Sequence, residues 1–90
     1  MHNVWIIDYI RTPIGKQGGA LSQIRPDDLA AHVMKALIER NHLDPALIDE
    51  VFMGCANQAG EDSRNIARNA LLLAGFPEHV PGVTINRNCA

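Results

Sequence analysis

Short apolar runs alternate with helical segments along this chain, and this alternation limits the fold more than any other feature. Residues 4–7, 50–55 and 83–86 are rich in apolar and branched side chains, as buried strands are. Between them, residues 27–40 and 65–74 carry apolar side chains at helical spacing. Strands separated by helices favour parallel pairing through right-handed crossovers. The sequence therefore predicts an α/β fold, ordered strand–helix–strand–helix–strand, with a mostly parallel sheet of three strands.

Local signals mark the ends of both predicted helices. Pro26 suits the first position of a helix, and Asp27 and Asp28 suit the positive end of its dipole. Gly75 is a natural residue after the last turn of the second helix, and Pro77 prevents that helix from continuing. Both helices are therefore bounded by their own sequence.

Size and charge exclude several classes of protein. Ninety residues form at most one domain, so residues 1–90 are expected to be a single unit. The net charge is −2 with the signs interspersed, which argues against a nucleic-acid partner. No apolar run approaches the roughly 18–20 residues that span a bilayer, which argues against a membrane protein. The amino terminus has neither the charged region nor the cleavage site of a signal peptide, so we expect a cytoplasmic protein.

The sequence predicts neither a metal site nor a phosphate-binding loop. The two cysteines, Cys55 and Cys89, have no metal-ligand spacing with any histidine. Gly15 and Lys16 suggest a P-loop, but that motif needs Ser or Thr where Gln17 stands, so a flexible surface loop is the better interpretation. The histidines considered as metal ligands are His2, His32, His42 and His79.

Cys89 is the candidate nucleophile. In open parallel sheets, ligands bind beyond the carboxyl ends of the strands, and Cys89 follows the third predicted strand. A helix that starts there would lower the pKa of the thiol and favour the thiolate that nucleophilic acyl transfer needs. Cys55 instead closes an apolar strand, where a small buried side chain is the ordinary interpretation. Position alone leaves a purely structural role for Cys89 open.

Four segments of the chain form a distinctive set, namely RTPIG at 11–15, DEVFMGC at 49–55, the helix at 65–75 and VPGVTINRNCA at 80–90. These four segments resemble the thiolase family. Together they cover the chain in order, with gaps like those of the family. Residues 54–65 are most similar to the degradative 3-oxoadipyl-CoA and 3-ketoacyl-CoA thiolases, although Asn88 stands where leucine is commoner in that group.

The resemblance implies that residues 1–90 are an incomplete thiolase-like N-terminal domain that ends just after the nucleophile, Cys89. In similar enzymes the cysteine attacks the 3-keto carbonyl of a 3-ketoacyl-CoA, acetyl-CoA leaves, and coenzyme A collects the shortened acyl group. Coenzyme A thioesters are then substrates, and no cofactor is expected. Similar enzymes are usually homodimers or homotetramers. Their catalytic histidines and second cysteine lie in the C-terminal half, so Cys55 and the histidines receive no catalytic role, and the 90 residues alone are expected to be inactive.

Two other functions stay open at this stage. A biosynthetic acetoacetyl-CoA thiolase would run the condensation instead of the cleavage. A natural remnant would act as a non-catalytic interaction module through its exposed apolar faces. The stop at Ala90, without a helix cap or charged tail, favours part of a longer enzyme, and the coding sequence beyond it would separate these alternatives. Beside the nucleophile, Arg87 would either orient loops by hydrogen bonding or form a surface ion pair.

Overall fold

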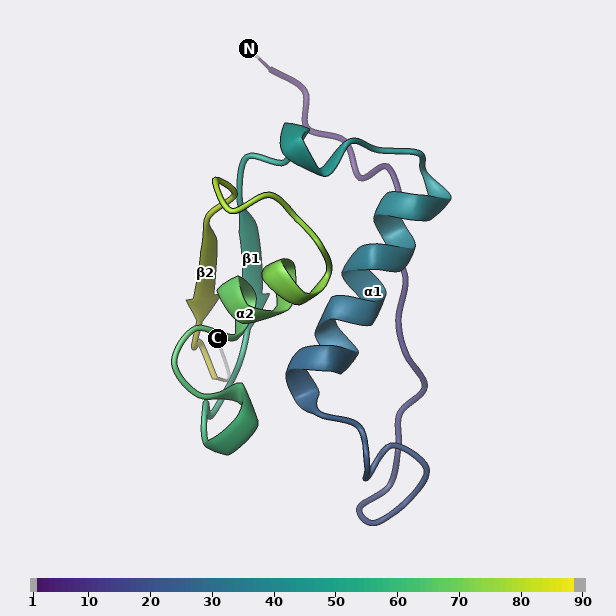
Figure 1. Ribbon diagram of the computed structural model, residues 1–90, viewed down its shortest axis with the longest axis vertical. Helices are drawn as coiled ribbons and strands as arrows, with labels where there is room; N and C mark the ends of the chain where they lie inside the picture. The colour runs from purple at the N-terminus through teal and green to yellow at the C-terminus, as the bar shows by residue number, and fades with distance from the viewer. Residues whose placement is uncertain (1, 89–90) are drawn as a thin grey trace.

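The computed structural model describes residues 2–88, in which helices and strands alternate along the chain (Figure 1). Both predicted helices and two of the three predicted strands are confirmed. Among the described residues, no helix combines the length and the hydropathy that a bilayer span requires. The elements in order are α1 (Pro26–Arg40), the 3₁₀ turn η1 (Pro45–Leu47), β1 (Val51–Gly54), the 3₁₀ turn η2 (Gly60–Asp62), α2 (Ile66–Leu73) and β2 (Gly82–Ile85).

The strands β1 and β2 pair in parallel, with α2 as the crossover that packs against them (Figure 1). The register places Val51, Phe52, Met53 and Gly54 beside Gly82, Val83, Thr84 and Ile85 respectively. Two backbone hydrogen bonds of 3.0 Å, from Val51 N to Pro81 O and from Cys55 N to Ile85 O, extend the ladder past both ends. The parallel crossover predicted from the alternation of elements is therefore confirmed.

Residues 4–7 do not form the predicted first strand. They lie past the C-terminal end of α1, near η1 (Figure 1, purple), and do not pair with β1, and Val4 and Ile6 are 94% and 88% exposed. The run does not pair because a strand that is apolar on both faces is stable only when other elements cover both faces. Here α2 packs against the sheet and α1 packs against α2, so within residues 2–88 no helix covers the other face of the sheet. The expectation of a three-stranded sheet was wrong for the described residues.

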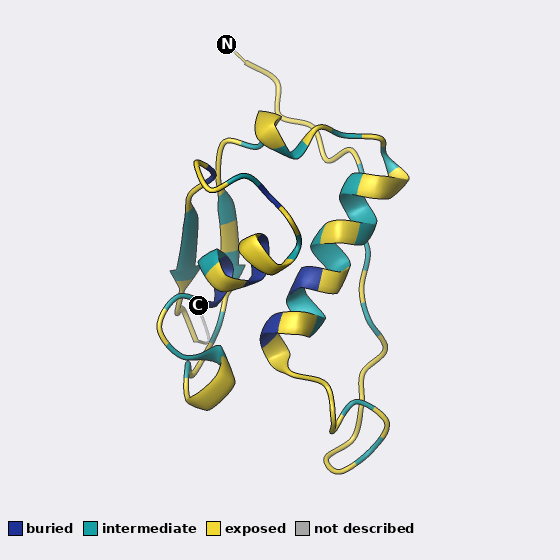
Figure 2. Cartoon of the chain, in the orientation of Figure 1, coloured by how far each residue is buried: buried dark blue, intermediate teal, exposed yellow. Residues whose placement is uncertain are grey.

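The hydrophobic core lies between α2, the loop that follows it and the inner side of α1 (Figure 2). Leu71, Phe76 and Val80 form its buried centre. Ala67 and Ala70 on α2 are also completely buried, and their small side chains let neighbouring elements approach the helix. Partly buried residues that pack against this centre are Met34, Ile38, Ile48, Val51 and Ala74.

The ends of both helices agree with the local sequence signals. Pro26 is the first residue of α1, and Asp27 in its first turn accepts hydrogen bonds of 3.1 Å from Arg25 Nε and Nη2. Gly75 follows α2 with a φ angle of 87°, a left-handed conformation that glycine adopts without a steric penalty. The predicted bounds of both helices lie within one residue of the observed ones.

Candidate active site

The carboxyl ends of β1 and β2 lie side by side, with Gly54 level with Ile85. Two loops leave this edge of the sheet. Residues 55–65 connect β1 to α2, and residues 86–88 lead from β2 toward Cys89. Because parallel sheets bind their ligands at this edge, it is the candidate active site.

Cys89, the predicted nucleophile, lies outside the described residues. Its acylation, its thiolate character and its place at the start of a helix therefore stay predictions. The two residues that precede it, Arg87 and Asn88, are exposed beyond the end of β2.

Asn86 joins the two loops at the edge of the sheet. Its side-chain Nδ2 donates a hydrogen bond of 2.8 Å to the backbone oxygen of Ala56. The last backbone hydrogen bond of the ladder, from Cys55 N to Ile85 O, lies one residue earlier on each strand. The Asn86 side chain therefore continues the pairing of the two strands past the end of the sheet.

Cys55 is half-buried beside a carboxylate, which corrects the expectation of a fully buried apolar position. Its thiol donates to Oδ2 of Asp62, with 3.6 Å between the sulfur and the oxygen, and such thiol hydrogen bonds are weak. The other carboxylate oxygen, Oδ1 of Asp62, accepts a hydrogen bond of 2.9 Å from Ala59 N. Asp62 therefore folds the loop after β1 back on itself.

Two side-chain amides fasten this loop and β2 to the first turn of α2. Oε1 of Gln58 accepts a hydrogen bond of 3.1 Å from Ile66 N, one of the N–H groups that has no partner within the helix. Asn65 caps the helix, since its Oδ1 accepts a 3.2 Å hydrogen bond from Arg68 N. Its Nδ2 also donates to the oxygen of Gly82, at 2.9 Å. The start of α2 is thus bound both to the loop and to the strand.

Thr84, in the middle of β2, adds two more hydrogen bonds to this network. Its hydroxyl donates to Oδ1 of Asn65 at 2.8 Å and accepts from Ala67 N at 3.1 Å. A hydroxyl group can donate and accept at once, so a single side chain serves both partners. The strand that leads to Cys89 is therefore held to the crossover helix by polar contacts as well as by packing.

The N-terminal domain model of the thiolase family matches residues 4–90, which is nearly the whole chain. This chain belongs to the thiolase family. The resemblance seen in the sequence is thereby confirmed, and so is the α/β fold class that it implied. The match also extends over the carboxyl edge of the sheet described above.

Named thiolases are close to this thiolase chain in sequence. It is 67% identical over 88 residues to a beta-ketoadipyl-CoA thiolase of Pseudomonas aeruginosa, covering 97% of this chain and 22% of that protein. It is 60% identical over 90 residues to a 3-oxoadipyl-CoA/3-oxo-5,6-dehydrosuberyl-CoA thiolase of Escherichia coli K12, covering 99% of this chain and 22% of that protein. The chain thus spans about a fifth of the length of these curated relatives.

A solved structure shares the fold of this chain. The crystal structure of the acetyl-CoA acetyltransferase of Bacillus anthracis superimposes with a TM-score of 0.74 at 43% sequence identity. The match covers 84% of this chain and 19% of that one.

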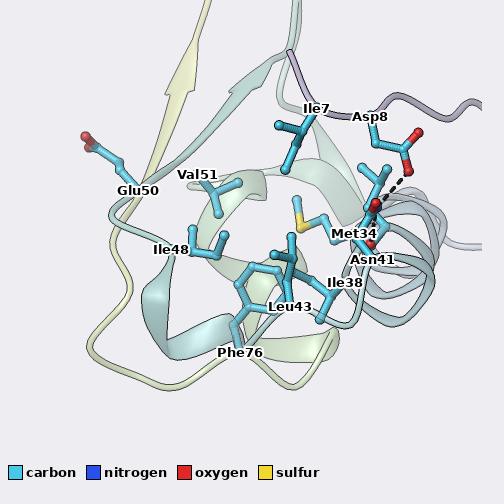
Figure 3. Close-up of a pocket in the computed structure, with 11 residues that line it drawn as sticks. Ile7, Asp8, Met34, Ile38, Asn41, Leu43, Ile48, Glu50, Val51 and Phe76 are labelled. Atoms are coloured by element: carbon cyan, nitrogen blue, oxygen red, sulfur yellow. Dashed lines mark hydrogen bonds between the residues drawn. The ribbon is translucent and has the colours of Figure 1, made fainter. Parts of the chain in front are cut away.

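An apolar pocket in this thiolase chain lies away from the candidate active site. It has a volume of about 250 Å³ and lies where β1 begins, between α1 and Phe76 (Figure 3). Asp8 and Asn41 meet at its rim, where Asn41 Nδ2 donates a 2.7 Å hydrogen bond to Asp8 Oδ2 (Figure 3). Val51, the first residue of β1, lines the pocket. The pocket therefore lies at the amino end of β1, opposite to the candidate active site.

The four histidines are exposed, and His32 and His79 lie away from the carboxyl ends of the strands. His32 is on α1, and Nε2 of His79 lies 3.4 Å from Ala46 O, beside η1 at the amino end of β1. Within residues 2–88, no group of three or more His, Cys, Asp or Glu side chains could hold a metal ion.

Sequence reasoning missed the amide side chains that hold the strand ends of this thiolase in place. An asparagine before a helical run is a capping signal, so Asn65 could have been found from its position. Nothing local marks Gln58 or Asn86, because their partners lie 8 and 30 residues away along the chain.

Proposed function

We propose that this chain is part of a thiolase that cleaves a 3-ketoacyl-CoA with coenzyme A through an acyl group carried on Cys89. The observation that supports this most directly is the 67% identity to a protein named beta-ketoadipyl-CoA thiolase. Since the chain spans 22% of that relative, the proposal concerns the whole enzyme. The base and the coenzyme A contacts would come from its remaining part.

The proposed reaction has two steps. The thiolate of Cys89 attacks the 3-keto carbonyl carbon, and the bond between C2 and C3 then breaks. The electron pair stays on C2, which takes up a proton from a general acid and leaves as acetyl-CoA. In the second step the thiol of coenzyme A loses its proton, attacks the acyl-cysteine thioester, and expels the Cys89 thiolate with the shortened acyl-CoA as product.

The preferred substrate in this proposal is 3-oxoadipyl-CoA. The chain is 67%, 65% and 64% identical to three proteins named beta-ketoadipyl-CoA thiolase, against 53% for a 3-ketoacyl-CoA thiolase of Serratia proteamaculans. Cleavage of 3-oxoadipyl-CoA between C2 and C3 gives acetyl-CoA and succinyl-CoA. Fatty 3-ketoacyl-CoA substrates are the less favoured choice.

The same proposal extends to the substrates, the compartment and the oligomeric state of the enzyme. Coenzyme A thioesters would be its substrates, with no further cofactor. It would act in the cytoplasm as a homodimer or a homotetramer, without a nucleic-acid or membrane partner.

The test uses the complete enzyme that contains this sequence. Purified enzyme is mixed with 3-oxoadipyl-CoA and coenzyme A, and the acyl-CoA products are separated by chromatography. Equal amounts of acetyl-CoA and succinyl-CoA are expected, and mass spectrometry of the acid-quenched enzyme should place a succinyl group on Cys89. Absence of both products, with an enzyme that is folded by circular dichroism, would sink the proposal.

A biosynthetic acetoacetyl-CoA thiolase is the second candidate function, because the solved structure that matches this chain is that of an acetyl-CoA acetyltransferase. The two candidates differ in substrate preference. The ratio of kcat/KM for 3-oxoadipyl-CoA to that for acetoacetyl-CoA decides between them. A ratio above one supports the degradative enzyme, and a ratio below one supports the biosynthetic enzyme.

A further inference from the structure

We propose that Asn86 is a positioning residue for Cys89, an inference that rests on the proposed role of Cys89 as nucleophile. Its side chain fixes the segment after β2 to the loop after β1, and so directs the chain that leads to the nucleophile. The argument begins at the end of the ladder, where the backbone hydrogen bond from Cys55 N to Ile85 O is the last one. Beyond Ile85 the sheet no longer determines the path of the chain.

Past that point the side-chain hydrogen bond of Asn86 holds the two strand ends together. Its Nδ2 lies 2.8 Å from the oxygen of Ala56, a good distance for an amide N–H that donates to a carbonyl. Asn86 itself is exposed, so this contact adds little to the core. Its consequence is geometric, since it fixes the direction in which the chain leaves the sheet.

Ala56 lies in a loop that has hydrogen bonds on both sides of it. Before it, the thiol of Cys55 reaches the carboxylate of Asp62, which also accepts from Ala59 N. After it, Gln58 accepts from the first N–H group of α2. A hydrogen bond to Ala56 therefore connects the segment after β2 to the crossover helix.

Only Arg87 and Asn88 separate this contact from Cys89. A chain spans at most about 3.3–3.6 Å per residue, so the three steps from residue 86 to residue 89 reach at most about 11 Å. Displacing a reacting group by about 1 Å can reduce the rate about 100-fold. Freeing the segment at Asn86 should therefore lower the rate of the chemical steps more than it lowers substrate affinity.

The experiment compares three variants of the complete enzyme. Asn86→Ala removes the donor, and Asn86→Asp keeps the size but places a carboxylate against the oxygen of Ala56. Asp44→Ala is the matched control, because it removes an exposed hydrogen bond of similar length, 3.0 Å to Ala46 N, at the amino end of β1. Each variant is measured for kcat and KM with 3-oxoadipyl-CoA, for Tm, and for the rate at which iodoacetamide alkylates Cys89 between pH 6 and 10.

Both Asn86 variants should lower kcat about tenfold or more with KM and Tm nearly unchanged, as expected for a displaced nucleophile. They should also slow alkylation of Cys89 at pH 7 several-fold, while Asp44→Ala leaves kcat and alkylation as in the wild type. A wild-type kcat and alkylation rate in both Asn86 variants would overturn the inference, and so would an equal loss in Asp44→Ala. A wild-type enzyme without thiolytic turnover would instead reject the proposed function, and the alkylation rates would still decide the role of Asn86.

Discussion

The hydroxyl of Thr84 lies 2.8 Å from Oδ1 of Asn65, so the middle of β2 is fastened to the residue that caps α2. These two residues are 19 positions apart in the sequence. The same hydroxyl accepts a hydrogen bond from Ala67 N, and Asn65 reaches back to the oxygen of Gly82. The strand that leads to the candidate nucleophile is thus held by a small polar network in addition to packing.

Replacing Thr84 by valine should destabilise the enzyme although the shape is kept. The change leaves the N–H group of Ala67 without its acceptor, which typically costs about 1–3 kcal/mol. Chemical denaturation monitored by circular dichroism measures the difference in unfolding free energy. Thr84→Ser keeps the hydroxyl and should lose clearly less. Equal stability of Thr84→Val and the wild type would show that the network contributes nothing.

Gly82 and Gly54 should respond oppositely to the same substitution. A Cβ on Gly82 would lie 2.7 Å from Arg68 N, inside the backbone of α2, whereas a Cβ on Gly54 would meet no atom within 4 Å. Gly82→Ala should therefore cost about 1–3 kcal/mol of stability, as overpacking does. Gly54→Ala should stay within about 0.5 kcal/mol of the wild type, as surface changes do. Thermal unfolding of the two variants side by side tests this, and similar Tm values would contradict it.

Cys89 should be the residue that becomes acylated, and Cys55 should not. A serine hydroxyl is far less ionised than a thiol at the same pH, so Cys89→Ser should lose nearly all turnover. Cys55→Ser should retain the chemistry. It should cost on the order of 1 kcal/mol of stability, because it places a polar hydroxyl in a half-buried site, and the Asp62 carboxylate, which can accept from that hydroxyl, keeps the cost from being larger.

Alkylation and mass spectrometry test this assignment directly. Iodoacetamide at neutral pH should label Cys89 first, and 3-oxoadipyl-CoA should protect it. A trapped acyl group on Cys55, or an active Cys89→Ser enzyme, would show that the proposed mechanism is wrong.

Asp8 should remain ionised well below the usual range of a carboxyl group. Two hydrogen bonds from the Arg40 guanidinium, followed by one from Asn41, lower its pKa from 3.8 to about 2. Because the folded-state pKa is the lower one, the stabilising effect is fully present above pH 3.8 and is lost as the pH falls through about 2. An NMR titration of the Asp8 carboxyl carbon should show this midpoint, and Arg40→Gln should return it toward 3.8. A midpoint near 3.8 in the wild type would refute the contact.

Residues 1–90 on their own should show no thiolytic turnover. They contain the candidate nucleophile, but the resemblance to thiolases places the base and the second cysteine in a later part of such enzymes. Removing groups that act as a unit costs orders of magnitude in rate. A sensitive assay of coenzyme A-dependent acetyl-CoA release tests this, with the complete enzyme as the positive control. Turnover by the purified 90 residues would contradict it.

The parts of the fold that could be predicted depend on local signals. Pro26 and Gly75 mark helix ends whatever the rest of the chain does, and both were correct. Residues 4–7 have the composition of a strand, yet pairing requires a partner edge and a cover on both faces, which composition does not report. The contact of Asn86 with Ala56 was missed for the same reason, because 30 residues separate the partners.

The same separation governs when the candidate site can form. The chain between Ala56 and Asn86 contains the whole of α2, so this hydrogen bond closes a long loop. Closing such a loop costs chain entropy that is recovered only when the non-local contacts of the crossover form with it. During synthesis the enzyme should therefore gain a correctly placed nucleophile in the same cooperative step in which α2 docks on the sheet, and partly folded chains should lack one.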